Sequence, residues 1–126
     1  MKRIWLALAL LLTVAGLCTA GGVYVHRQTD ILLGYLDELE DSYLRGDTAE
    51  TLCWARRLAE EYEQRTASMD CFIAHSDLED SRETAVMLPA VVEQEGWEEL
   101  RMEAARLREQ LEHLQSLDKP TLRNVL

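Results

Sequence analysis

The stretch WEELRMEAARLREQLEHL (residues 97–114) decides the fold, because its apolar side chains recur at alternating steps of three and four residues. This spacing places them along one face of an α-helix and leaves the charged side chains on the other faces. A helix with a single apolar stripe has to bury that stripe against other elements. The stripe consists of Trp97, Leu100, Ala104, Leu107, Leu111 and Leu114.

Three stretches upstream show the same helical spacing. The first stripe consists of Leu32, Tyr35, Leu36, Leu39, Tyr43 and Leu44. The second consists of Leu52, Ala55, Leu58, Ala59 and Tyr62, and the third of Leu78, Ala85, Leu88 and Val92. Sustained strand-like alternation is missing from the sequence, so we expect an all-α fold with about four helices packed as an antiparallel bundle.

Two of the joints between the stripes contain glycine. Gly46 is expected to end the first helix, and Asp47 to begin the second with Glu50 as its capping-box partner. Gly96 is expected to separate the third helix from the fourth. Pro89 is expected to kink the third helix, because proline removes one backbone hydrogen bond.

The remaining joint lies in MDCFIAHSDLED (residues 69–80). We expect His75 to end the preceding helix, where a positive charge suits the helix dipole. Ser76 is then expected to cap the next helix, with Glu79 three positions further on.

The N-terminal segment from Ile4 to Val25 contains 22 residues without a charge. As a helix it would be roughly 33 Å long, enough to cross a hydrocarbon core of about 30 Å. Trp5 and Tyr24 lie near its ends, where aromatic side chains favour the membrane interfaces. We therefore expect an uncleaved anchor spanning residues 4–25. A cleavable signal peptide is the alternative, with CTAGG (residues 18–22) as its cleavage region.

The domain organisation follows from this segment: residues 1–25 as membrane anchor or signal peptide, and residues 26–126 as a helical domain. Lys2, Arg3 and the amino terminus outweigh Arg27, so we expect the N-terminus in the cytoplasm and the domain outside it. The protein would be a single-pass protein of the cytoplasmic membrane, or secreted if residues 1–20 are removed.

The acidic balance restricts the partners. The formal net charge is −10, and it is −12 for the 11 basic and 23 acidic residues that remain without Lys2 and Arg3. Such a surface repels phosphate, which argues against nucleic acid as a partner. The expected partners are the lipid bilayer, through residues 4–25, and a protein of the membrane or envelope.

Cys71 and His75 are four residues apart and would project from one face of a helix, as half of a zinc site could. Zinc takes four ligands, and Cys53 and His113 would have to complete the set through tertiary packing. We favour the capped joint described above and expect no cofactor. Cys53 and Cys71 are expected to be free thiols.

Catalytic patterns are absent from the sequence. There is no Gly-x-Ser-x-Gly elbow and no glycine-rich phosphate loop. The adjacent carboxylates Glu60–Glu61 and Glu98–Glu99 lie off the apolar stripes, as solvated helix faces do. We therefore expect a protein that is not an enzyme, with no catalytic residues.

Four segments resemble an uncharacterised family of small membrane-anchored helical proteins of clostridia-type Gram-positive bacteria, a domain-of-unknown-function family. The segments are MKRIWLALALLL (1–12), RGDTAETL (45–52), FIAHSDLED (72–80) and LREQLEHLQSLDKPTLRNVL (107–126). Ala74 stands where the family pattern has aspartate, and Cys71 where it has an apolar residue; Pro89 also departs from the pattern. The resemblance implies a single-pass anchored helical domain and no assigned activity.

The expected function is that of a non-enzymatic accessory or scaffold protein on the outer face of the cytoplasmic membrane. The alternative is a metal- or redox-responsive sensor that uses Cys71 and His75. For a docked partner, Leu122, Val125 and Leu126 in the tail PTLRNVL (120–126) are the candidate contacts. The same tail could instead fold back and cover the core of the bundle.

Overall fold

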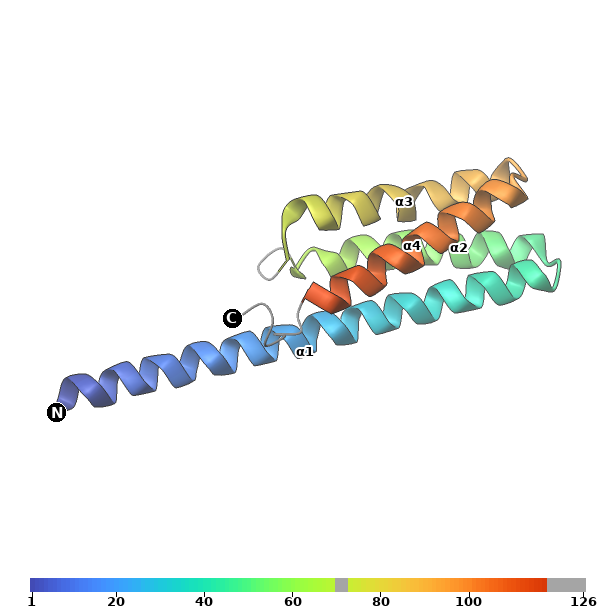
Figure 1. The fold of residues 1–126 in the computed structure, drawn as a ribbon. Coiled ribbons are helices and arrows are strands. Elements are labelled where there is room, and N and C mark those ends of the chain that lie inside the picture. The colour runs from blue at the N-terminus through green and yellow to red at the C-terminus, as the bar shows by residue number, and fades with distance from the viewer. Residues whose placement is uncertain (70–72, 118–126) are drawn as a thin grey trace.

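The computed structural model describes residues 1–69 and 73–117, which form four α-helices. These helices are α1 (Lys2–Leu44), α2 (Thr48–Thr66), α3 (His75–Glu93) and α4 (Trp97–Leu117). Successive helices run in opposite directions, and the N-terminal half of α1 projects alone beyond the others (Figure 1). The expected all-α antiparallel bundle is therefore confirmed.

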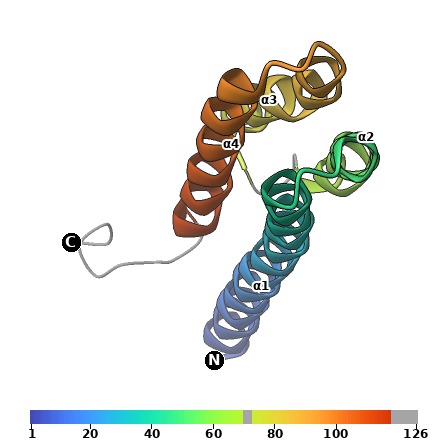
Figure 2. The ribbon, with the colours of Figure 1, turned by 90° about the vertical axis from the view of Figure 1, so that its right-hand side faces the viewer.

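The helices pack in a ring, with contacts between α1 and α2, α2 and α3, α3 and α4, and α4 and α1. Figure 2 shows this ring from the end of the bundle opposite the projecting part of α1. One continuous core fills the centre, and apolar side chains of all four helices contribute to it. Its largest fully buried members include Leu36 on α1, Tyr62 on α2, Leu88 on α3 and Leu107 on α4.

The expected stripes supply most of this core, with one exception. Leu44 is 78% exposed. It lies eight residues after Leu36, so at about 100° per residue its side chain has rotated by roughly 80° away from that of Leu36. The end of α1 therefore turns Leu44 out of the core.

Six buried hydroxyl groups were not anticipated from the apolar pattern. Each donates a hydrogen bond to a carbonyl three or four residues earlier in its own helix, as Thr51 does to Asp47 at 2.7 Å. Small hydroxyl side chains can be buried in a helix in this way without a partner elsewhere. They are Thr29, Ser42, Thr51, Thr66, Ser81 and Thr84.

At the joint between α1 and α2, Gly46 ends the first helix and Asp47 caps the second, as expected. The expected capping-box role of Glu50 is wrong, because its carboxylate pairs with Arg45 at 3.0 Å. Gly46 has a positive φ of 75°, and its N–H donates to the carbonyl of Tyr43, while the N–H of Asp47 donates to that of Ser42. This is the Schellman arrangement that ends helices. The carboxylate of Asp47 then accepts a hydrogen bond from the N–H of Glu50 at 3.1 Å, which caps α2.

The same arrangement ends α3, with a different residue in the left-handed position. Glu95, not Gly96, has the positive φ, at 56°. The N–H groups of Glu95 and Gly96 donate to the carbonyls of Val92 and Val91. Pro89 lies inside α3 without ending it, since the helix continues to Glu93; the bend expected there stays a prediction.

The joint between α2 and α3 corrects the expectation for His75 and Ser76. His75 is the first residue of α3, Ala74 is its N-cap, and no side chain caps this end. Ser76 is therefore inside the first turn. The helix α2 ends at Thr66, well before His75, and the burial of Met69 and Ile73 in the connection that follows accounts for this early end.

Candidate functional site

The residues considered for a metal site do not come together in the part of the chain that is described. Cys53 is a free, exposed thiol on α2. His75 begins α3, and His113 is exposed in the last turns of α4. Across residues 1–69 and 73–117 no group of three histidine, cysteine, aspartate or glutamate side chains could hold a metal ion. Cys71 lies outside the described residues.

The candidate partner residues of the tail, Leu122, Val125 and Leu126, also lie outside the described residues. The described structure therefore leaves both the docking and the back-folding interpretation of the tail as predictions.

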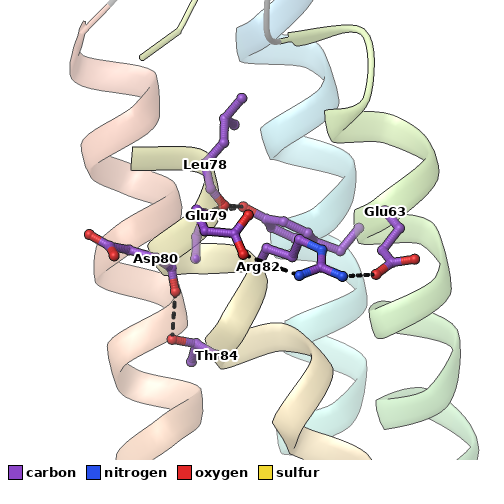
Figure 3. A network of polar contacts seen from close by, with 8 residues as sticks. Glu63, Leu78, Glu79, Asp80, Arg82 and Thr84 are labelled. Atoms are coloured by element: carbon purple, nitrogen blue, oxygen red, sulfur yellow. Dashed lines mark hydrogen bonds and ion pairs between the residues drawn. The ribbon is translucent and has the colours of Figure 1, made fainter. Parts of the chain in front are cut away.

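A polar network joins α2 and α3 (Figure 3). Arg82 donates to Glu79 on its own helix at 3.2 Å and to Glu63 on α2 at 2.9 Å. The hydrogen bond to Glu63, more than any other interaction, raises the pKa of Arg82 above its ordinary value. These solvent-exposed ion pairs link α3 to α2 at the surface of the bundle.

Behind this network, the hydroxyl of Tyr62 is buried between α2 and α3. It forms a short contact with the hydroxyl of Ser81 and donates to the carbonyl of Leu78 at 3.3 Å. Burial raises the pKa of Tyr62 to about 12, although the bond to Ser81 acts in the opposite direction. A phenol with so high a pKa stays protonated at neutral pH, which suits a structural hydrogen bond.

Further polar contacts connect the C-terminal half of α4 to α1. Arg108 donates to Asp37 at 2.5 Å and to Glu40 at 3.0 Å. Nearer the projecting apolar segment, the amide of Gln115 donates to Asp30 at 2.6 Å. The helix α4 runs obliquely, starting beside the end of α3 and approaching α1 along its later turns (Figure 1).

The part of α4 that precedes Arg108 lies further from α1, and a groove of about 630 Å³ opens there between the two helices. We call it the α1–α4 groove. The residues that line it are Leu39, Glu40, Tyr43 and Leu44 of α1 and Glu98, Leu100, Arg101, Met102, Ala104 and Ala105 of α4. Ala104 and Ala105 fill little of the space between the helices. Leu44 and Met102 line it as well, and they are 78% and 71% exposed.

Polar residues border the α1–α4 groove. Glu40 and Glu98 supply two carboxylates, and Arg101 supplies one guanidinium. At the end of the groove, the ring of Tyr43 packs against that of Trp97 with their centres 5.7 Å apart. An apolar hollow with a mostly acidic border can hold apolar side chains of another helix that also carries basic residues.

Sequence reasoning missed this groove. Leu44 was assigned to the core stripe, and Met102 lies between apolar positions of the fourth stripe without belonging to it. The pair Ala104–Ala105 is the one feature of the sequence that could have indicated the groove, because two small side chains leave space beside a helix. This indication is weak, since alanine is common in every helix.

In the described part of the chain, α1 is the one helix long and apolar enough to cross a membrane, judged by length and composition. The fold therefore defines a class: a four-helix bundle whose first helix extends as an apolar N-terminal segment. The family model described as "Domain of unknown function (DUF4363)" matches residues 20–125. The chain belongs to this family. No curated protein and no solved structure matches it.

Proposed function

We propose that the protein is a non-enzymatic scaffold, anchored in the cytoplasmic membrane by the projecting part of α1, with the N-terminus inside and the bundle outside. One observation carries the proposal: α1 runs without a break from an exposed apolar segment into the core of the bundle. All residues from Met1 to Ala20 are exposed, whereas Val25, Leu32 and Leu36 are fully buried.

The exposed segment supports an anchor because it contributes no buried side chain to the bundle. Its leucines and Ile4 would meet water in a soluble chain, at a cost of about 1.5–3 kcal/mol for each side chain left unburied. A bilayer removes this cost, and a helix satisfies all of its own backbone hydrogen bonds there. The cleavable signal peptide remains the alternative, because the first buried residue, Gly21, falls within the CTAGG region.

Intact mass spectrometry of the membrane-extracted protein tests the anchor directly. The expected mass is that of the full 126-residue chain. A chain beginning near Gly21 would show that the apolar segment is removed and that the bundle is released.

For the scaffold activity, we propose that the α1–α4 groove receives an amphipathic helix of a membrane or envelope protein with basic residues beside its apolar face. The support is the apolar lining together with the acidity of the chain, whose formal net charge is −10. At the border, Glu98 lies beside Arg101, and Glu40 is paired with Arg108. Apolar anchors in a groove with matched charges at the rim are a recurrent way to bind helices.

A photo-crosslinking amino acid at Met102, introduced in intact cells, tests the groove. We expect one discrete adduct that Leu44→Glu abolishes, and a captured partner whose contact segment is a basic amphipathic helix. Met87 on α3 is a matched control, because it is also a methionine and is 48% exposed. Equal capture from both positions, or capture of the protein itself, would contradict the proposal.

The same experiment addresses the tail. A crosslinker at Leu122 or Val125 is expected to capture the same partner if the tail contributes to docking. Crosslinks to the protein's own bundle would support the back-folded tail instead.

A further inference from the structure

We propose that the bundle stands directly on the bilayer, with its anchor-side end lying in the lipid headgroup region. We call this end the base and define it by residues 24–28, 65–69, 73–76 and 113–116. The inference rests on the proposed anchor, and it holds for either orientation of the chain. Figure 1 shows these segments at the end of the bundle from which the apolar part of α1 emerges.

The length of the exposed apolar segment is the first support. Beginning at Ile4, a hydrocarbon core of about 30 Å takes up roughly 20 residues of helix and ends near Val23. With a tilt of about 20° it ends near Tyr24. The bundle, however, already buries Gly21 and Val25. Packing therefore begins at the level where the hydrocarbon ends, and no residues are left to serve as a spacer.

Hydrogen bonds fix other segments at the same level. The hydroxyl of Tyr24 is bonded to that of Ser68, in the connection after α2, at 2.5 Å. The amide of Gln115, near the end of α4, donates to the carbonyl of His26 at 3.4 Å. The headgroup region extends roughly 5 to 8 Å beyond the hydrocarbon, which corresponds to residues 24–28 of α1. Ser68 and Gln115 consequently lie within it.

The distribution of charge is an independent second support. The four segments of the base contain no aspartate or glutamate, although the chain carries 23 of them. The same segments contain Arg27 and Arg65 and all three histidines of the chain. Residues 70–72 and 118–126, which the structure does not describe, carry equal numbers of acidic and basic side chains: Asp70 and Asp118, and Lys119 and Arg123.

The opposite end of the bundle is strongly acidic. The segments DELED (37–41) and EQEGWEE (93–99) alone contribute eight carboxylates there. An anionic lipid surface repels carboxylates within about one Debye length and attracts basic side chains. The nearest carboxylates lie at the margin of the base, on Asp30, Asp77 and Glu112, and that of Asp30 is paired with His26 and Gln115.

Depth measurements on the full chain test this inference. Cys18, Cys53 and Cys71 are replaced by serine, and single cysteines at Ser68, Ser116, Ala49 and Leu10 receive a nitroxide label. The probe membrane is a vesicle of equal parts phosphatidylglycerol and phosphatidylcholine. Collision with oxygen and with a water-soluble nickel chelate then reports the depth of each label, and circular dichroism checks that each variant is folded.

We expect the Leu10 label in the hydrocarbon, the Ser68 and Ser116 labels within roughly 5 to 8 Å of the phosphates, and the Ala49 label in bulk water. A buried Leu10 label with Ser68 and Ser116 as accessible to nickel as Ala49 would overturn this inference alone. A Leu10 label in water would overturn the proposed anchor, and with it this inference.

A charge test uses Ser116→Glu with Ala49→Glu as the matched control. Both positions are exposed, with Ser116 near the end of α4 and Ala49 near the start of α2, at opposite ends of the bundle. Raising the phosphatidylglycerol content is expected to lower the unfolding midpoint of Ser116→Glu relative to the unsubstituted protein. Ala49→Glu is expected to show no such dependence on lipid. The same response in both variants would contradict placement of the base at the headgroups.

Discussion

The hydroxyl of Tyr24, at the end of the uncharged segment of α1, is hydrogen-bonded to the hydroxyl of Ser68 at 2.5 Å. The two residues are 44 positions apart in the sequence. The bond connects the anchor helix to the loop between α2 and α3, at the level where the bundle begins. It therefore joins the end of the apolar N-terminal segment, the proposed anchor, to the loop of the bundle.

Tyr24→Phe is expected to loosen this loop without unfolding the bundle. Both hydroxyls are exposed, so the free energy of unfolding should fall by less than about 1 kcal/mol. Amide hydrogen exchange of residues 67–69 should accelerate, because local opening then costs less. Ser116→Ala is the control: its hydroxyl bonds within its own helix, to the carbonyl of His113, and should leave this exchange unchanged.

Tyr62 is expected to make the bundle sensitive to alkaline pH. Its pKa is about 12 in the folded protein and about 10 when unfolded, so only the unfolded state loses the proton between these values. The stabilisation is fully present below pH 10 and is lost as the pH rises to 12. The two-unit difference corresponds to at most about 2.7 kcal/mol.

Urea unfolding of Tyr62→Phe at a series of pH values checks this prediction. The variant should lack the fall in stability between pH 10 and 12, and at neutral pH it should lose about 1 kcal/mol with the buried hydrogen bonds. Tyr24→Phe should keep the fall. An unchanged pH profile in Tyr62→Phe would show that another group is responsible.

Asp47 and Ser76, near the starts of α2 and α3, should respond differently to substitution by alanine. Asp47→Ala should reduce the free energy of unfolding by about 0.5–2 kcal/mol, because the N–H of Glu50 loses its partner. Ser76→Ala should change it by less than about 0.5 kcal/mol, since Ser76 does not cap α3. Thermal unfolding monitored by circular dichroism distinguishes them, and a larger loss for Ser76→Ala would restore the cap expected from sequence.

The two joint glycines should also differ. Gly46→Ala is expected to cost about 1 kcal/mol, because a β-carbon is disfavoured at its φ of 75°. Gly96→Ala should be nearly neutral, since a β-carbon there would lie 3.5 Å or more from its neighbours. A large loss at Gly96 would place the left-handed residue of this joint at Gly96 and not at Glu95.

Two leucines from the expected stripes should respond very differently to truncation. Leu107→Ala is expected to cost about 2–5 kcal/mol, because Leu107 is fully buried. Leu44→Ala should change the free energy of unfolding by less than about 0.5 kcal/mol. Denaturant titration measures both, and a cost for Leu44 close to that for Leu107 would show that the groove is closed in solution.

The sequence by itself determined the helices, the joint at Gly46 and the cap at Asp47. These features depend on helical periodicity and on hydrogen bonds between residues within a few positions of one another, which local sequence specifies. It also identified most of the apolar residues that form the core, although Val25, Met69 and Val91 belong to none of the expected stripes. It placed the α2–α3 joint wrongly, because the end of α2 is set by the burial of Met69 and Ile73 and not by a local cap.

Only the tertiary structure decided how the helices are oriented relative to one another and where a groove lies between them. The α1–α4 groove depends on the contact of Arg108 with Asp37 and Glu40, and on the room left beyond it by Ala104 and Ala105. Such contacts join residues about 70 positions apart, so no periodicity within one helix can indicate them. At the level where packing begins on α1, its contacts are likewise long-range, with Ser68 of the α2–α3 connection and Gln115 of α4.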